Sequence, residues 1–124
     1  MSKQAIRSGN LLIAVIGEPD TVTGMLLAGM GNLDAQRNSN FLVVEQNTPR
    51  DVIEEAFHRF TRRNDIGILL INQHIADLIR PLLDDYDQNV PTILEIPGVH
   101  TPYDSSKDAI LKRAHRLTSS AHER

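Results

Sequence analysis

Histidines and clustered acids are the residues of this chain whose types could bind a metal or move a proton. The five histidines are dispersed, and those of the last quarter, His100, His115 and His122, have no acid or second histidine at ligand spacing. Asp84, Asp85 and Asp87 form an acidic run, but the glycine turn and distal glutamate of an EF-hand loop are missing. The patterns indicate solvated or packed histidines and a polar loop.

Nucleophilic and phosphate-binding motifs are also missing. The chain has no Cys and no Gly-x-Ser-x-Gly elbow, which removes thiolate chemistry, disulfides and that type of hydrolase. Gly17 is followed by Glu18 and Asp20, whose charges would repel a phosphate. A phosphoacceptor domain needs an aspartate where the third expected strand ends, and that strand runs into Asn72 instead. We therefore expect no enzyme activity and no cofactor or metal.

Length and composition bound the class of protein. A chain of 124 residues is one domain, and its 40% hydrophobic and 23% charged residues are an ordinary globular balance. Thirteen Lys and Arg against sixteen Asp and Glu give a net charge of −3, so bulk charge will not hold the molecule on nucleic acid. The apolar runs are too short to span a bilayer, and no secretory signal precedes Leu11. We expect an intracellular domain that is not inserted into a membrane.

Four short apolar runs predict buried strands. They are continuous rather than alternating, which is typical of a parallel sheet covered by helices. Pro91 lacks a backbone N–H and therefore predicts that the last run is an edge strand. The runs cover residues 11–16, 41–44, 66–71 and 90–96.

Between these runs the apolar spacing changes to three and four, which predicts helices. The first helix is expected to have Asp20 or Thr21 as its cap and an apolar stripe of Val22, Met25, Leu26, Met30 and Leu33. The second is expected to begin at Pro49 behind a Thr48 cap and to bury Val52, Ile53, Ala56, Phe57 and Phe60. The third is expected to have Asn72 as its cap, a kink or early end at Pro81, and a stripe of Ile75, Leu78, Ile79, Leu82 and Leu83.

Alternating strands and helices predict an α/β domain with a four-stranded parallel sheet in the order 2-1-3-4, as in flavodoxin-like and Rossmann-like folds. Right-handed crossovers then place the first helix on one face and the next two on the other, so that one face is left half bare. The expected organisation is a flexible N-terminus at 1–10, an α/β domain at 11–103, and a C-terminal helix and tail at 104–124.

The C-terminal helix differs from the rest of the chain in charge. Asp104 or Ser105 is its expected cap, with Asp108 supporting the first turn. Residues 105–124 hold five Lys or Arg against two acids, a local charge of +3, whereas residues 1–104 carry −6. Its narrow apolar stripe is Ile110, Leu111, Ala114 and Leu117. Two alternatives stay open: the helix folds back over the half-bare sheet face, or it reaches a partner helix, with Lys112, Arg113 and Arg116 providing electrostatic fit.

Several separated stretches closely resemble the F subunit of the eukaryotic vacuolar-type proton-translocating ATPase. The resemblance extends from Leu11 to about Leu117 and includes the turn Ile71-Asn72-Gln73-His74-Ile75-Ala76 and the Pro102-Tyr103-Asp104 sequence. It departs at residues 97–101, where the family usually has Ser-Lys and a His directly before Pro-Tyr-Asp. The stretches that carry it are LLIAVIGEPDTVTGMLLAGMGNL, NFLVVEQNT, NDIGILLINQHIADLIR, PTILEIP and PYDSSKDAILKRA.

The resemblance implies a non-catalytic subunit of a rotary proton pump. Such a subunit binds the coiled coil of the D subunit in the central stalk, meets other subunits of the soluble sector and the stalk adaptor of the membrane sector, and tunes ATP hydrolysis and its coupling. It implies a peripheral location on the cytoplasmic face of vacuolar and endomembrane compartments. The expected partner contacts are the apolar and basic residues of the last helix, and secondarily the turn after the third strand: Ile110, Leu111, Lys112, Arg113, Ala114, Arg116, Leu117, Asn72, Gln73 and His74.

The alternative function belongs to another class of protein. The same scaffold serves free-standing ligand-binding or signalling modules, and fold alone does not separate these from a stalk subunit.

Overall fold

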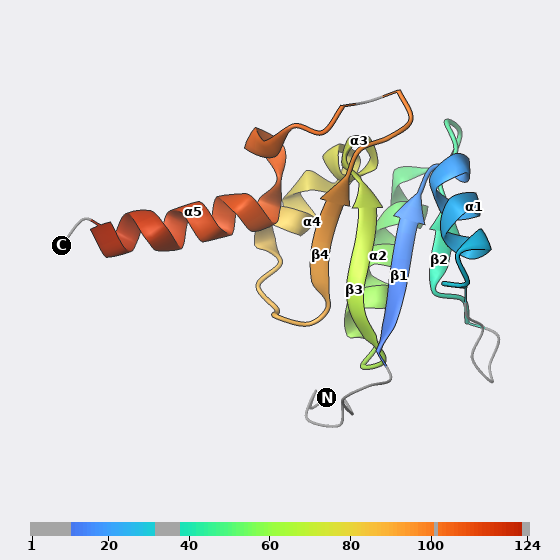
Figure 1. Ribbon diagram of the computed structural model, residues 1–124, viewed down its shortest axis with the longest axis horizontal. Helices are drawn as coiled ribbons and strands as arrows, with labels where there is room; N and C mark the ends of the chain where they lie inside the picture. The colour runs from blue at the N-terminus through green and yellow to red at the C-terminus, as the bar shows by residue number, and fades with distance from the viewer. Residues whose placement is uncertain (1–10, 32–37, 101, 123–124) are drawn as a thin grey trace.

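The computed structural model describes residues 11–31, 38–100 and 102–122, and its four strands form one parallel sheet in the order β2-β1-β3-β4 (Figure 1). Both neighbours of β1 pair with it in parallel, and β3 pairs in parallel with β4. This confirms the predicted fold class and strand order. The strands are β1 (Leu12–Gly17), β2 (Phe41–Val43), β3 (Ile66–Asn72) and β4 (Thr92–Ile96).

The strand boundaries differ from the predicted ones by one or two residues. β4 begins only at Thr92, because Pro91 has no N–H for the ladder. β4 lies at the edge of the sheet, as Pro91 predicted. β3 continues one residue further than predicted and pairs Asn72 with Ile96.

Helix α1 (Pro19–Leu27) starts earlier and ends earlier than predicted. Glu18 is the N-cap residue, so the predicted caps Asp20 and Thr21 are wrong; the fixed φ of Pro19 suits the first helical position. The chain leaves the helix at Gly29, whose φ of 87° favours glycine. Met30 therefore lies beyond the helix, and Leu33 lies outside the described residues.

Helix α2 (Arg50–Arg62) is capped by Pro49, so the predicted Thr48 cap is wrong. The Thr48 hydroxyl instead accepts a hydrogen bond from the Glu45 N–H at 2.9 Å. Four of the five predicted stripe residues are buried, and Val52 is 40% exposed. The buried ones are Ile53, Ala56, Phe57 and Phe60.

The third helical segment is broken, as Pro81 predicted. It consists of α3 (Gln73–Ala76), the 3₁₀ turn η2 (Asp77–Ile79) and α4 (Arg80–Asp85), with Pro81 in the first turn of α4, where its missing N–H is tolerated. Of the predicted apolar stripe, Ile75, Ile79 and Leu83 are buried, Leu82 is half-buried and Leu78 is 43% exposed.

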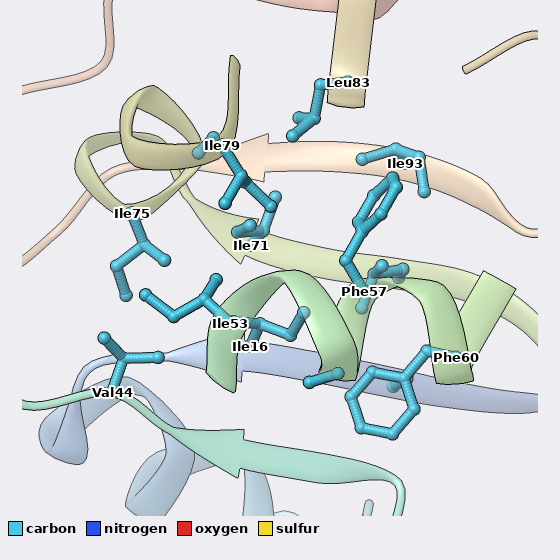
Figure 2. Close-up of a cluster of buried hydrophobic side chains, with 14 of the residues drawn as sticks. Ile16, Val44, Ile53, Phe57, Phe60, Ile71, Ile75, Ile79, Leu83 and Ile93 are labelled. Atoms are coloured by element: carbon cyan, nitrogen blue, oxygen red, sulfur yellow. The ribbon is translucent and has the colours of Figure 1, made fainter. Parts of the chain in front are cut away.

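The core lies between the sheet and the layer formed by α2, α3 and α4. Figure 2 shows Phe57 and Phe60 of α2 among isoleucines of β1, β3 and β4, with Ile75, Ile79 and Leu83 alongside. Because side chains alternate along a strand, the neighbours of Leu69, Ile71 and Ile93 in the sequence point to the other face.

That other face is only partly covered. α1 packs over β1 and β2, and no helix lies in front of β3 and β4 in Figure 1. Leu94 is 36% exposed there, and Ile68, Leu70 and Ile96 are half-buried. The predicted half-bare face is therefore confirmed.

Candidate protein-binding site

Helix α5 (Ala109–His122) projects away from the body of the protein. Figure 1 shows it leaving beside β4 and α4 and extending beyond the edge of the sheet. Ala109 at its start is buried in the core, whereas Leu117 is 72% exposed. In this structure the helix does not fold back over the half-bare sheet face, and its contact with a partner helix stays a prediction.

Two separate caps precede α5, where the sequence predicted one. Asp104 caps the short 3₁₀ helix η3 (Ser105–Lys107) by accepting a hydrogen bond from the Ser106 N–H at 3.0 Å. Asp108 caps α5, because its Oδ1 accepts from the Ile110 N–H at 3.0 Å. The prediction that Asp104 or Ser105 caps the long helix is therefore wrong, since the helical segment is interrupted at Asp108.

Hydrogen bonds fix both caps electrostatically. Those from the hydroxyl and backbone N–H of Ser106 lower the pKa of Asp104. The Tyr103 hydroxyl donates to Asp108 Oδ2 at 2.5 Å, and this bond raises the pKa of Tyr103 to about 12. Asp104 therefore stays ionised as the acceptor for Ser106.

The predicted apolar stripe of α5 is divided between two sides of the helix. Ile110, Ala114 and Leu117 line a groove of about 290 Å³ between α5 and the body, whose opposite wall includes Leu83, Tyr86 and Ile93. This cavity, with Arg113 on its helical wall, is hereafter the α5 groove. Leu111 lines a second hollow on the other side of the helix, with Lys112, His115 and Arg116.

The basic residues of α5 are weakly neutralised by the body. Lys112 Nζ lies 4.0 Å from Asp84 Oδ1, and both side chains are more than 40% exposed, which makes a weak ion pair. Arg113 and Arg116 form no ion pair with the part of the chain that the structure describes. α5 therefore presents positive charge on either side of apolar groups.

The turn after β3 is largely built into the body. Asn72 is fully buried, and its amide bonds the Glu18 N–H at 2.8 Å and the Pro97 carbonyl at 3.1 Å. Gln73 is 2% exposed, whereas the His74 side chain is 35% exposed. A contact between these three residues and a partner stays a prediction. Of the three, only His74 has a partly exposed side chain in this structure.

His74 and Glu18 hold the loop in which the chain departs from the resemblance. His74 Nε2 lies 3.5 Å from Glu18 Oε2, and Glu18 Oε1 accepts from the Val99 N–H at 2.6 Å. His74 Nδ1 is buried without a hydrogen-bond partner among the described residues. Within those residues no group of three or more His, Cys, Asp or Glu gathers as metal ligands.

Sequence reasoning missed the buried acid beside α5. The Glu95 side chain is 1% exposed and lies on the core side of β4, where it bonds Arg80. The sequence does carry a sign of it, since Glu95 is a single acid inside the apolar run of residues 92–96. A buried charge rarely occurs without a partner, so an acid at this position predicts a buried ion pair.

No helix in the described part of the chain is long and apolar enough to cross a bilayer. The parallel sheet with helices on both faces, joined to a projecting basic helix, defines a flavodoxin-like α/β protein with a C-terminal extension.

Comparison with known proteins agrees on one family. Residues 13–114 match the family model described as the ATP synthase (F/14-kDa) subunit. The F subunit of the human V-type proton ATPase is 55% identical over 103 residues, which are 83% of this chain and 87% of that protein. Its counterpart in the V-type proton ATPase of Dictyostelium discoideum is 51% identical over 113 residues, 91% of this chain and 94% of that protein. The chain belongs to the family of V-type ATPase F subunits.

Among solved structures, the F subunit of the V-type ATP synthase of Archaeoglobus fulgidus matches 70% of this chain and 98% of its own. The two are 24% identical, and the TM-score is 0.48.

Proposed function

We propose that this chain is a non-catalytic subunit of a V-type proton-pumping ATPase and that it binds the coiled coil of the D subunit through α5. The observation that carries the proposal is the exposure of an amphipathic, basic helix that projects from a member of the family of F subunits. Leu117 is 72% exposed near the end of the helix. A partner that covers this apolar side chain removes it from water, which favours binding.

The residues that line the α5 groove indicate what kind of partner fits it. Its apolar wall of Ile110, Ala114 and Leu117 fits the apolar seam of a helix, since residues three and four apart lie on one helical face. Arg113 lies on the same wall and would pair with an acidic residue of the partner. Lys112 and Arg116 extend the basic surface on the other side of the helix. An acidic, amphipathic helix pair satisfies both demands.

Family membership supports a wider role as part of the proposal. In the proposed role, the chain turns with the D subunit as part of the central stalk, contacts further subunits of the soluble sector and the stalk adaptor of the membrane sector, and tunes ATP hydrolysis. It is then a peripheral component on the cytoplasmic face of vacuolar and endomembrane compartments. Catalysis belongs to other subunits, and this chain needs no cofactor.

Binding measurements with the recombinant D coiled coil test the proposal. The double variant Ile110→Ala with Leu117→Ala should lose about 2 kcal/mol or more of binding, roughly a 30-fold weaker affinity, because both side chains of the groove wall are truncated. Arg116→Gln should weaken binding less, and its effect should shrink as salt is added.

The matched control is Val52→Ala, which truncates a 40% exposed apolar side chain on α2 and should leave the affinity unchanged. Equal affinities for the double variant and the unaltered chain would show that α5 is not the anchor.

A further inference from the structure

Three side chains hold the base of α5 from inside the body. Glu95 on β4 is buried and accepts hydrogen bonds from Arg80 Nη1 at 2.8 Å, from Gln73 Nε2 at 3.2 Å and from the Ala109 N–H at 2.9 Å. The last of these donors is the first residue of α5. A buried carboxylate is stable only with such partners, so the acid and the start of the helix are fixed together.

Arg80 and Gln73 extend this hold to the residues just before α5. Arg80 Nη1 also donates to the Lys107 carbonyl at 2.7 Å. Gln73 bonds both backbone groups of Asp104: its Nε2 donates to the carbonyl at 2.7 Å, and its Oε1 accepts from the N–H at 2.5 Å. The backbone at residues 104, 107 and 109 is thus tied to α3, α4 and β4.

Arg80 keeps its charge in this place. Burial opposes the charged form, but hydrogen bonds and attraction from Glu95 and Asp77 outweigh it and raise the pKa of Arg80. Arg80 Nη2 donates to Asp77 Oδ1 at 2.6 Å, and Lys107 Nζ lies 3.6 Å from the other oxygen of that acid. The guanidinium is therefore held at a fixed angle by acceptors on both sides.

We propose that Gln73, Arg80 and Glu95 act together as a clasp that sets the direction in which α5 leaves the body. Apolar contacts tolerate sliding and rotation, whereas hydrogen bonds require particular distances and angles. A helix of 14 residues is about 21 Å long at 1.5 Å per residue, so a tilt of about 10° at its base moves its tip by roughly 4 Å. The clasp thereby also sets the width of the α5 groove.

The consequence for binding rests on the proposed function of α5. A helix that already points in the bound direction loses less conformational freedom on association. When only a fraction of molecules has that direction, the apparent affinity is reduced by that fraction. Gln73, Arg80 and Glu95 are positioning residues in this sense: they touch the base of α5, and their effect reaches the partner through its direction.

Distance measurements between spin labels test the clasp directly. The chain has no Cys, so cysteines introduced at the exposed positions Asp51 on α2 and Thr118 on α5 are its only thiols. The unaltered clasp should give one narrow distance distribution. Glu95→Gln, which loses the charge that holds Arg80, should broaden it about twofold or more, and Gln73→Leu should broaden it while leaving the ion pair in place.

Two controls separate direction from general stability. Glu55→Gln breaks an exposed ion pair with Arg59 that has the same 2.8 Å separation, and it should leave the distribution narrow. Labels at Asp20 and Asp51, both on the body, should keep a narrow distribution in every variant. If either clasp variant does not fold, the other carries the test.

Binding to the D coiled coil adds a second measurement. The clasp variants should bind about threefold or more weakly, and the partner should narrow their broadened distributions again. A broadened distribution with unchanged affinity would support the clasp and contradict the proposed function of α5. Distributions as narrow in Glu95→Gln and Gln73→Leu as in the unaltered chain would overturn the clasp, whatever happens to affinity.

Discussion

Tyr86 and Tyr103 connect single side chains to the setting of α5. Tyr86 packs edge to face on Phe57, and its hydroxyl donates to the Pro91 carbonyl. Its burial raises its pKa to about 12, and a nearby Arg113 partly opposes this. The hydrogen bond to Asp108 raises the pKa of Tyr103 to about 12 as well. These are the two tyrosines of the chain.

A pH titration of tyrosinate absorbance tests both environments. In the folded protein neither tyrosine should ionise near pH 10, where a free tyrosine does, and both should ionise near pH 12. Folding raises both pKa values, so the two protonated tyrosines contribute to the stability of the folded state. This contribution to the free energy of unfolding is fully present below about pH 10 and is lost as the pH rises through about 12.

The denatured chain provides the reference, with both groups titrating near pH 10. Tyr103→Phe should remove one of the two late steps. A full one-tyrosine step near pH 10 in the folded protein would contradict the hydrogen bond or the burial that the structure gives these groups.

At the scale of residues, the sequence predicts which side chains are buried better than it predicts which side chains form hydrogen bonds with each other. Ile53, Ala56, Phe57 and Phe60 follow from spacing alone, because a helical period places them on one face. The hold of Glu95 on Ala109 does not follow, because its partners are 14 residues and more apart in the chain and are brought together only by the packing of β4 on α3 and α4.

At the scale of elements, α5 depends on its cap more than the other helices do. Beyond its buried first residue it packs on little of the body, and an isolated helix of about 14 residues is marginal in water. Asp108 therefore contributes stability that no core contact replaces, while α2 is held by the buried side chains of its inner face.

Removing this cap should loosen α5 selectively. Asp108→Ala should cost about 1 kcal/mol of helix stability, which speeds amide hydrogen exchange in α5 roughly fivefold and leaves α2 unaffected. Hydrogen exchange monitored by NMR measures both helices in one sample.

As a control, Asp87→Ala removes an exposed acid from the loop after α4, and it should change amide hydrogen exchange in neither helix. Equal protection of α5 in Asp108→Ala and in the unaltered chain would mean that other contacts hold the helix.

The element boundaries show where sequence patterns stop being sufficient. The order of strands follows from the alternation of apolar runs and helices, but the caps of three helices lie one to four residues from their predicted positions. In two cases a proline stands at or next to the true cap. In the third, Asp104 caps the short η3 and Asp108 caps α5, and no apolar period distinguishes these two segments from one continuous helix.

At the scale of the whole molecule, the body and α5 have different physical character. Residues 1–104 carry −6, and the body buries a continuous apolar core. The segment 105–124 carries +3, and its Leu111 and Leu117 are exposed. The difference in charge can be read directly from the sequence. The direction of α5 cannot, because it depends on contacts that exist only after the sheet and α3 have formed.

Site-specific photocrosslinking can detect whether the exposed end of α5 contacts the D subunit in the assembled ATPase. A photoreactive residue in place of Leu117 should form a covalent adduct with the D subunit in the purified complex, and one in place of Asp51 on α2 should not. Assembly of the Leu117-substituted chain into the complex without any adduct to the D subunit would contradict this contact.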